Sequence, residues 1–163
     1  MTQLPEPVQA VDTPIRLDYT YTPGVATSRF LRGIAEGRIL GQRCPSCSKV
    51  YVPPRGACPM CGLPTEEQVE LPGRGTVTTF CVINVPKPEL PNPYVSGQVL
   101  LDGADIPAMF LLREVEPADV RIGMRVETVW ADRAQWGTTL ENISYFRPTG
   151  EPDAAYESYR EYV

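Results

Sequence analysis

Apolar and β-branched residues are concentrated in five short runs in the second half of the chain. Turn residues separate the runs, and the Val, Ile, Thr and aromatic content of each is typical of a β-strand. The runs cover residues 76–85, 94–102, 106–115, 124–131 and 138–146. Short antiparallel strands with a break between the third and fourth predict a mostly β fold, with a closed OB-type barrel over 73–146. An open sandwich is the alternative.

The first 41 residues have a different pattern. Prolines interrupt residues 1–26, which we expect to be an extended arm. It is either a disordered tail or a segment that lies along a partner, because Leu17, Tyr19 and Tyr21 alternate as in a strand. Residues 27–41 predict a short helix. Thr27 or Ser28 would cap it and Gly41 would end it, with Phe30, Leu31 and Ile34 on one face.

The C-terminal tail, residues 147–163, predicts a short final helix that begins near Pro152. Tyr156, Tyr159 and Tyr162 then recur every three residues. Two interpretations of these tyrosines stay open. Either they fold onto the barrel, or they form an adhesive stripe for another subunit, because tyrosine buries a large area with little loss of rotamer freedom.

Composition excludes several classes of function. The 163-residue chain has a formal net charge of -5, only two lysines and no histidine. The acidic net charge argues against a protein that binds the nucleic-acid backbone. A nucleic-acid-binding module made of a zinc ribbon and an OB barrel is nevertheless kept as the alternative function. Without histidine, catalytic groups such as Ser-His-Asp are excluded. The chain has no apolar run that would span a membrane and no export signal, so we expect a cytoplasmic protein.

Four of the five cysteines form two Cys-x-x-Cys pairs, Cys44–Cys47 and Cys58–Cys61, within residues 42–72. Two such pairs at this separation are typical of a rubredoxin-like ribbon, in which four thiolates surround one zinc ion. A site closed by four cysteines has no open coordination position, so the zinc should be structural. Disulfides, redox chemistry and an iron site are the competing interpretations. The odd cysteine, Cys81, lies inside a strand run, where we expect a buried, inert thiol.

Positive charge is concentrated before and within the ribbon. Between residues 29 and 55 there are six basic residues and one acidic residue, which gives a local balance of +5. Part of this charge would offset the thiolates. The remainder is either an ordinary solvated face or a surface that attracts an anion such as a nucleotide phosphate. No acid–base pair is evident. Asp102, Asp105 and Asp132 lie in turn-like contexts, where carboxylates commonly serve as turn residues.

In its order of helix, ribbon and barrel, the chain resembles the family of zinc-ribbon, OB-fold proteins associated with thiolases and other acyl-CoA enzymes. The segments that carry the likeness are Phe30 to Cys47, Tyr51-Val-Pro-Pro-Arg55, Cys58-Pro-Met-Cys61, Gly73 to Phe80 and Ile122 to Val126. The likeness covers residues 25–146. The ribbon alone is generic, whereas the whole arrangement is fairly specific.

The resemblance implies a non-catalytic accessory subunit that pairs with a thiolase-fold aldolase or thiolase, or with a hydratase. The partner would act on lipid or steroid acyl-CoA thioesters, and a heterotetramer is expected. This chain would complete the complex and help form the channel for coenzyme A. As candidate contacts with the ligand or partner we name six residues: Arg29, Arg32, Arg55, Trp136, Tyr156 and Tyr159.

Overall fold

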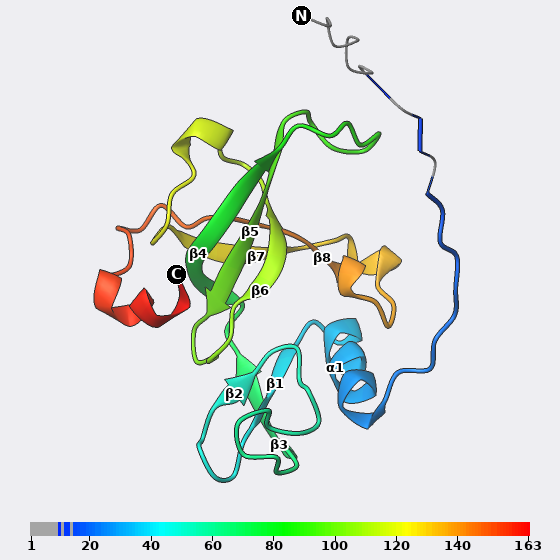
Figure 1. Ribbon diagram of the computed structural model, residues 1–163, viewed down its shortest axis with the longest axis vertical. Helices are drawn as coiled ribbons and strands as arrows, with labels where there is room; N and C mark the ends of the chain where they lie inside the picture. The colour runs from blue at the N-terminus through cyan, green and yellow to red at the C-terminus, as the bar shows by residue number, and fades with distance from the viewer. Residues whose placement is uncertain (1–9, 11, 14) are drawn as a thin grey trace, which may run out of the picture.

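The computed structural model describes residues 10, 12–13 and 15–163. The predicted arm lies partly outside these residues. After residues 15–24, which have no regular secondary structure, the described chain forms one α-helix and eight strands, with five 3-10 turns among and after them (Figure 1). The strands form two bodies, a 3-stranded sheet of order β2-β1-β3 and a closed barrel of order β4-β5-β6-β8-β7. The mostly β fold with an OB-type barrel is therefore confirmed. In the described part of the chain no helix is long and apolar enough to cross a membrane.

Helix α1, Val25–Ala35, buries Phe30 and Ile34 as the spacing predicts. Two details of the prediction are wrong. The N-cap residue is Gly24, with no side-chain cap bond, so neither Thr27 nor Ser28 caps the helix. The chain leaves the helix at Gly37, whose φ of +79° suits glycine, whereas Gly41 lies inside a strand. Gly37 was therefore the local stop signal, and the pairing of β1 with β3 places Gly41 inside a strand.

The ribbon sheet contains β1, Ile39–Arg43, β2, Val50–Tyr51, and β3, Glu67–Leu71. The central strand β1 is antiparallel to both neighbours, with Gln42 opposite Tyr51 and Gly41 opposite Val69. Its inner end, at Ile39 and Leu71, belongs to the main hydrophobic core that continues into the barrel. The two cysteine loops lie at the outer end. The sheet therefore carries the metal-binding loops on a base that the barrel core supports.

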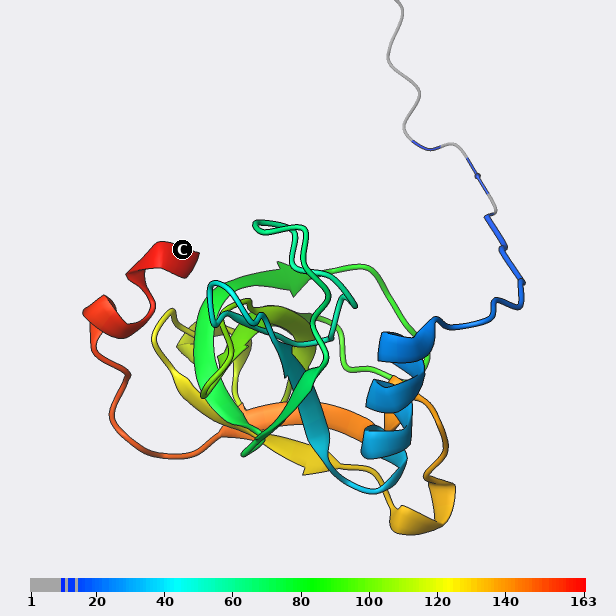
Figure 2. The same cartoon turned by 90° about the horizontal axis from the view of Figure 1, so that it is seen from below.

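The barrel strands are β4, Arg74–Ile83, β5, Tyr94–Leu101, β6, Ala108–Leu112, β7, Arg125–Trp130, and β8, Ile143–Pro148. Figure 2 shows them as a ring seen from the ribbon end. A parallel contact at Leu112 and Phe146 and an antiparallel pairing of β4 with β7 close the ring. Valines from three strands and the fully buried Phe146 fill the interior. The closed ring leaves no barrel edge free for strand pairing.

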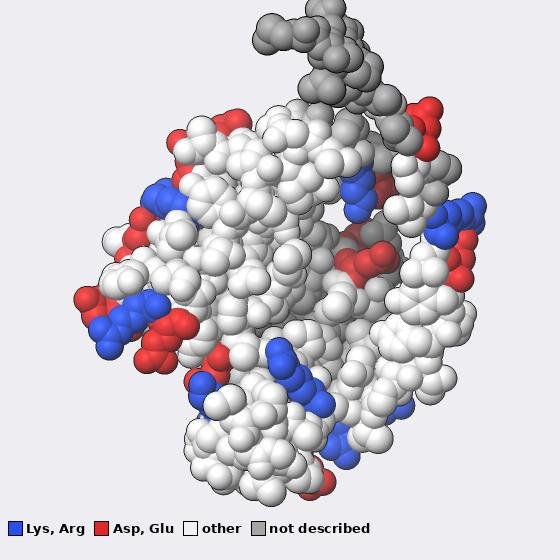
Figure 3. Space-filling view, viewed as in Figure 1, with Lys and Arg blue, Asp and Glu red and all other residues white. Residues whose placement is uncertain are grey.

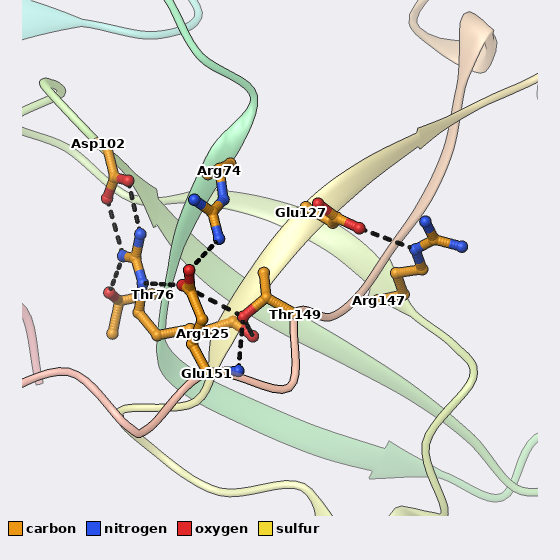
Figure 4. A network of polar contacts seen from close by, with 8 residues as sticks. All are labelled: Arg74, Thr76, Asp102, Arg125, Glu127, Arg147, Thr149 and Glu151. Atoms are coloured by element: carbon orange, nitrogen blue, oxygen red, sulfur yellow. Dashed lines mark hydrogen bonds and ion pairs between the residues drawn. The ribbon is translucent and has the colours of Figure 1, made fainter.

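The C-terminal tail is not the predicted α-helix. It forms two 3-10 turns, Tyr156–Ser158 and Arg160–Tyr162, and lies against the barrel because Ala154 N–H donates to Gly123 O and Tyr159 packs on Gly123. Figure 4 shows the ion pairs beneath this segment. Arg74 reaches Glu151 at 2.7 Å, and Arg125 binds both carboxylate oxygens of Asp102, at 2.6 and 2.8 Å. Because Glu151 pairs with Arg74 and also lies 4.0 Å from Arg125 Nε, it fixes the tail to both β4 and β7.

Candidate functional site

The four paired cysteines come together at the outer end of the ribbon. Their sulfur atoms all lie within 4.8 Å of one another, and the Cys47 and Cys58 sulfurs are 3.7 Å apart. A tetrahedral ion with four bonds of about 2.3 Å to sulfur requires sulfurs about 3.8 Å apart, so the donor set fits a thiolate metal site. All four cysteines are free, which overturns the disulfide alternative.

The two cysteine loops have the same backbone geometry. In each, the first cysteine donates its N–H to the carbonyl five residues later, and its own carbonyl accepts from the amide four residues later. The residues at that fourth position, Ser48 and Gly62, have φ values of 60° and 68°. Ser48 therefore occupies the place that glycine takes in the second loop, at some conformational cost. The repeat directs one buried and one more exposed sulfur from each loop to a common point.

Tyr51 is a member of the site that motif analysis missed. Its side chain is buried, and its hydroxyl lies 3.2 Å from the Cys58 sulfur. The hydrogen bond from this hydroxyl lowers the pKa of the Cys58 thiol to about 6. The Arg55 guanidinium covers the tyrosine ring, 5.8 Å from its centroid. The contact between the Tyr51 hydroxyl and the Cys58 sulfur forms only when the ribbon is folded. The sequence signal for it is therefore limited to an aromatic residue between the two cysteine pairs.

A polar joint connects the ribbon and the helix to the barrel. Asp105, in the β5–β6 turn, accepts from Val50 N–H at 2.7 Å and donates its own N–H to Val50 O. The fully buried Asn142 donates to Ile34 O, at the end of α1, and also bonds both backbone groups of Gly137. These bonds satisfy buried backbone groups on both sides of the joint, so the metal site is held in a fixed orientation to the barrel.

Comparison with known proteins agrees with this geometry. Residues 32–64 match the model of the ChsH2 rubredoxin-like zinc ribbon domain, and residues 68–131 match the ChsH2 C-terminal OB-fold domain. A DUF35 domain-containing scaffold protein of Methanocaldococcus jannaschii is 42% identical over 96 residues, which are 56% of this chain and 67% of that protein. One of Pyrococcus furiosus is 31% identical over 63% of this chain and 76% of that protein. The chain belongs to the DUF35 family.

Three further proteins are similar to this DUF35 chain. A chain of the solved Ltp2-ChsH2(DUF35) aldolase has 27% identity and a TM-score of 0.61, and the match covers 79% of this chain and 98% of that one. A probable enoyl-CoA hydratase alpha subunit of Thermomonospora curvata is 33% identical over 58% of this chain, but only 30% of its own length is covered. A DUF35 structure from Sulfolobus solfataricus, at 18% identity and a TM-score of 0.57, shares the fold.

The three arginines predicted to contact a ligand or partner lie on or near α1 and the ribbon. Arg29, Arg32 and Arg55 are exposed around α1 and the ribbon, and none makes an ion pair with a described residue. Other arginines of the same basic region do have partners, since Arg38 binds Glu70 and Arg43 binds Glu67. The acidic residues of β3 therefore neutralise part of the positive region and leave these three arginines available to an anion.

The predicted aromatic contacts have different exposures. Trp136 is half-buried, stacks on Trp130 with ring centroids 5.2 Å apart and donates its N–H to Ala131 O, so it packs at the joint near Gly37. Tyr159 is buried against the barrel, whereas Tyr156 is 57% exposed and meets it edge to face. Only Tyr156 of this pair keeps a large free surface.

Cys81 is exposed, so the expectation of a buried thiol is wrong. It lies opposite Ser96, on the outer face of the barrel where Met109 is also exposed. This part of β4 has apolar residues at successive positions, and alternation therefore could not show which of them point inward. Charged side chains lie mainly around the margins of the face that Figure 3 shows, with few over the middle of the barrel.

The three carboxylates that the sequence places in turn-like contexts all have structural partners. Asp102 is paired with Arg125, Asp105 binds the backbone of Val50, and Asp132 accepts from Ala134 N–H at 3.0 Å. Groups already engaged in this way are poorly placed to exchange a proton with a substrate.

Proposed function

We propose that this chain is a non-catalytic accessory subunit of an acyl-CoA-processing complex, whose ribbon holds a structural zinc ion. The observation that carries the proposal is the shared ribbon-and-barrel arrangement with the ChsH2 chain of an aldolase, over nearly the whole length of that chain. The structural engagement of Asp102, Asp105 and Asp132 supports the non-catalytic part. The name scaffold protein, given to two relatives, is in keeping with it.

The metal in this proposal shapes the ribbon and takes no part in turnover. Four thiolates fill a tetrahedral coordination sphere, so no position is left for water or substrate. Zinc suits this donor set, and a zinc ribbon model matches the residues that contain all four cysteines. The contribution of the chain is then the surface that the ribbon, α1 and the barrel present together.

The partner in this proposal is a thiolase-fold aldolase or thiolase that makes or breaks C–C bonds in lipid or steroid acyl-CoA thioesters. Arg29, Arg32 and Arg55 are the candidate contacts for the phosphates of coenzyme A, because they are exposed cations without acidic partners among the described residues. Tyr156 and the Trp136 loop are the candidate partner contacts. A hydratase is the second partner class, which the relative from Thermomonospora curvata supports.

Co-expression of this chain with the thiolase-fold enzymes encoded in the same genome tests the proposal. We expect one of them to co-purify in a stable complex and to cleave or condense acyl-CoA substrates only when this chain is present. The isolated chain should turn over no acyl-CoA. Partners that are all soluble and fully active alone, with no complex on size exclusion, would refute the proposal.

A further inference from the structure

Residues 15–21 of the N-terminal arm belong to no helix or strand and pair with no other described segment, but their apolar and polar side chains alternate strictly. Ile15, Leu17, Tyr19 and Tyr21 are 88, 77, 72 and 63% exposed. The side chains between them are polar. Strict alternation of this kind gives an extended segment one apolar and one polar face.

Contacts within the arm show both faces. The rings of Tyr19 and Tyr21 lie 6.4 Å apart, as expected of side chains two residues apart on one side of a strand. Arg16 and Asp18, at the intervening positions, pair with each other through a hydrogen bond. The four apolar side chains on this face of the arm are therefore exposed.

The backbone of the arm is also unpaired. None of the strand pairs found in the described residues includes 15–21, and Figures 1 and 2 show the trace of this segment running outside the body of the molecule. Its base, however, is fixed, because Ser28 bonds both Pro23 O and Gly24 O at the start of α1. An extended backbone with free N–H and C=O groups and one apolar face has the properties needed for strand addition to a sheet edge.

We infer that residues 15–21 dock as an added β-strand on an exposed sheet edge of the catalytic partner subunit, with Leu17 and Tyr19 at the centre of the apolar contact. The inference rests on the proposed function, because that function supplies the partner. The arm lies outside the stretches that match the family models, residues 32–64 and 68–131. It therefore provides a partner-selective contact beyond the shared ribbon and barrel.

A second copy of this chain is a poorer occupant than a different protein. The barrel is closed and has no edge. Of the ribbon edges, β2 has only two residues, and β3 carries Glu67 and Glu70, which already bind arginines of its own chain. A seven-residue apolar strand finds no edge of matching length and character among these described strands.

The test compares two neighbouring substitutions that add the same charge to opposite faces of the arm. We expect Tyr19→Asp to weaken the binding of the full-length chain to its thiolase-fold partner about 30-fold, a loss typical of a central aromatic contact. Thr20→Asp, on the polar face, should weaken it by less than about threefold. Affinity is measured by titration calorimetry. Metal content and circular dichroism should be the same in both variants, because the arm does not pack on the body.

Hydrogen exchange gives a second, independent readout. Strand addition protects alternate amides, since only every second residue of an added strand bonds to the edge it joins. We therefore expect protection at every other position of 15–21 in the complex. Equal effects of Tyr19→Asp and Thr20→Asp, uniform absence of protection, or arm-dependent self-association of the isolated chain would overturn the inference while leaving the proposed function intact. Failure of the wild-type chain to bind any such partner would overturn both.

Discussion

The barrel and the outer ribbon of this DUF35 chain are stabilised by different forces. The barrel belongs to one continuous core of aliphatic side chains around Phe146. Val50 and Val52 of the ribbon belong to this same core. Around the cysteine loops themselves, the separate buried cluster is limited to Cys44, Tyr51 and Cys58, with Cys61 and Ile106 packed against it. So few apolar groups cannot offset the conformational entropy of ordering the two loops. The comparison indicates that the barrel folds by burial of apolar surface, and we expect the ribbon tip to need the proposed metal ion in order to fold.

Removal of the metal should therefore unfold the ribbon tip and leave the barrel folded. Of the changes considered, it should have the largest effect on stability. Structural zinc binding contributes about 10–16 kcal/mol in ribbon-sized units, and in such units this free energy drives folding. We expect a chelator under reducing conditions to abolish the NMR dispersion of residues 44–66. The signals of β4 to β8 should remain. Reloading with zinc is the control, and loss of the barrel signals together with those of the ribbon would contradict the division.

A cavity in the barrel should give the converse result. Phe146 is fully buried, and its ring lies 4.5 Å from that of Phe110. Phe146→Ala is expected to lower the free energy of unfolding by about 3–5 kcal/mol, measured by denaturant titration. Met109→Ala, at an exposed position of β6, should change it by less than about 0.5 kcal/mol. A marked loss of metal affinity in Phe146→Ala would show that the two regions are more strongly coupled than their contacts suggest.

The same contrast determines how much could be predicted from the sequence. The cysteine loops depend on short-range spacing, so the sequence alone predicted that Cys44, Cys47, Cys58 and Cys61 would lie close together, as they do. The barrel strands depend on local composition and could be placed to within a few residues. At the end of α1 two glycines competed as stop signals, and the choice of Gly41 over Gly37 was wrong because Gly41 lies in β1, where it pairs with Val69 of β3, 28 positions later in the sequence.

Residues that join distant parts of the chain gave no local signal. Asn142 lies in a turn-rich stretch, where asparagine is common, and its contact with Ile34 O spans 108 residues. Tyr51 has the appearance of a core aromatic until the fold brings its hydroxyl to a sulfur. Long-range polar contacts of this kind depend on the tertiary arrangement, which single-sequence patterns do not contain.

The joint between the two regions provides a prediction of intermediate size. Asn142→Leu keeps the volume of the side chain but leaves Ile34 O and the backbone of Gly137 without their partners. Unsatisfied buried groups should cost about 2 kcal/mol in the free energy of unfolding, measured by denaturant titration. The matched control is Asn84→Leu, at an exposed position, which should have little effect. If the two variants had the same free energy of unfolding, Asn142 would not stabilise the joint.

The smallest predicted effect concerns the hydrogen bond from Tyr51 to Cys58. Tyr51→Phe removes the hydroxyl that lowers the pKa of the Cys58 thiol to about 6, so that pKa should rise in the variant. A proton then competes with the metal at higher pH, and the pH midpoint of zinc release should move upward. Loss of a neighbouring hydrogen bond typically reduces metal affinity by about tenfold, or about 1.4 kcal/mol.

Chelator competition measures this affinity, and the sulfur-to-metal charge-transfer band of the cobalt-substituted protein reports whether the four-thiolate geometry persists. Tyr145→Phe is the control, because its hydroxyl donates to Glu114 on the barrel, away from the cysteines. If Tyr51→Phe retained wild-type affinity and the wild-type pH midpoint, the tyrosine would serve only to fill space beneath Arg55. If the metal affinity and the pH midpoint both change while the stability of the barrel does not, the side chains of the ribbon tip set its metal affinity independently of the barrel core.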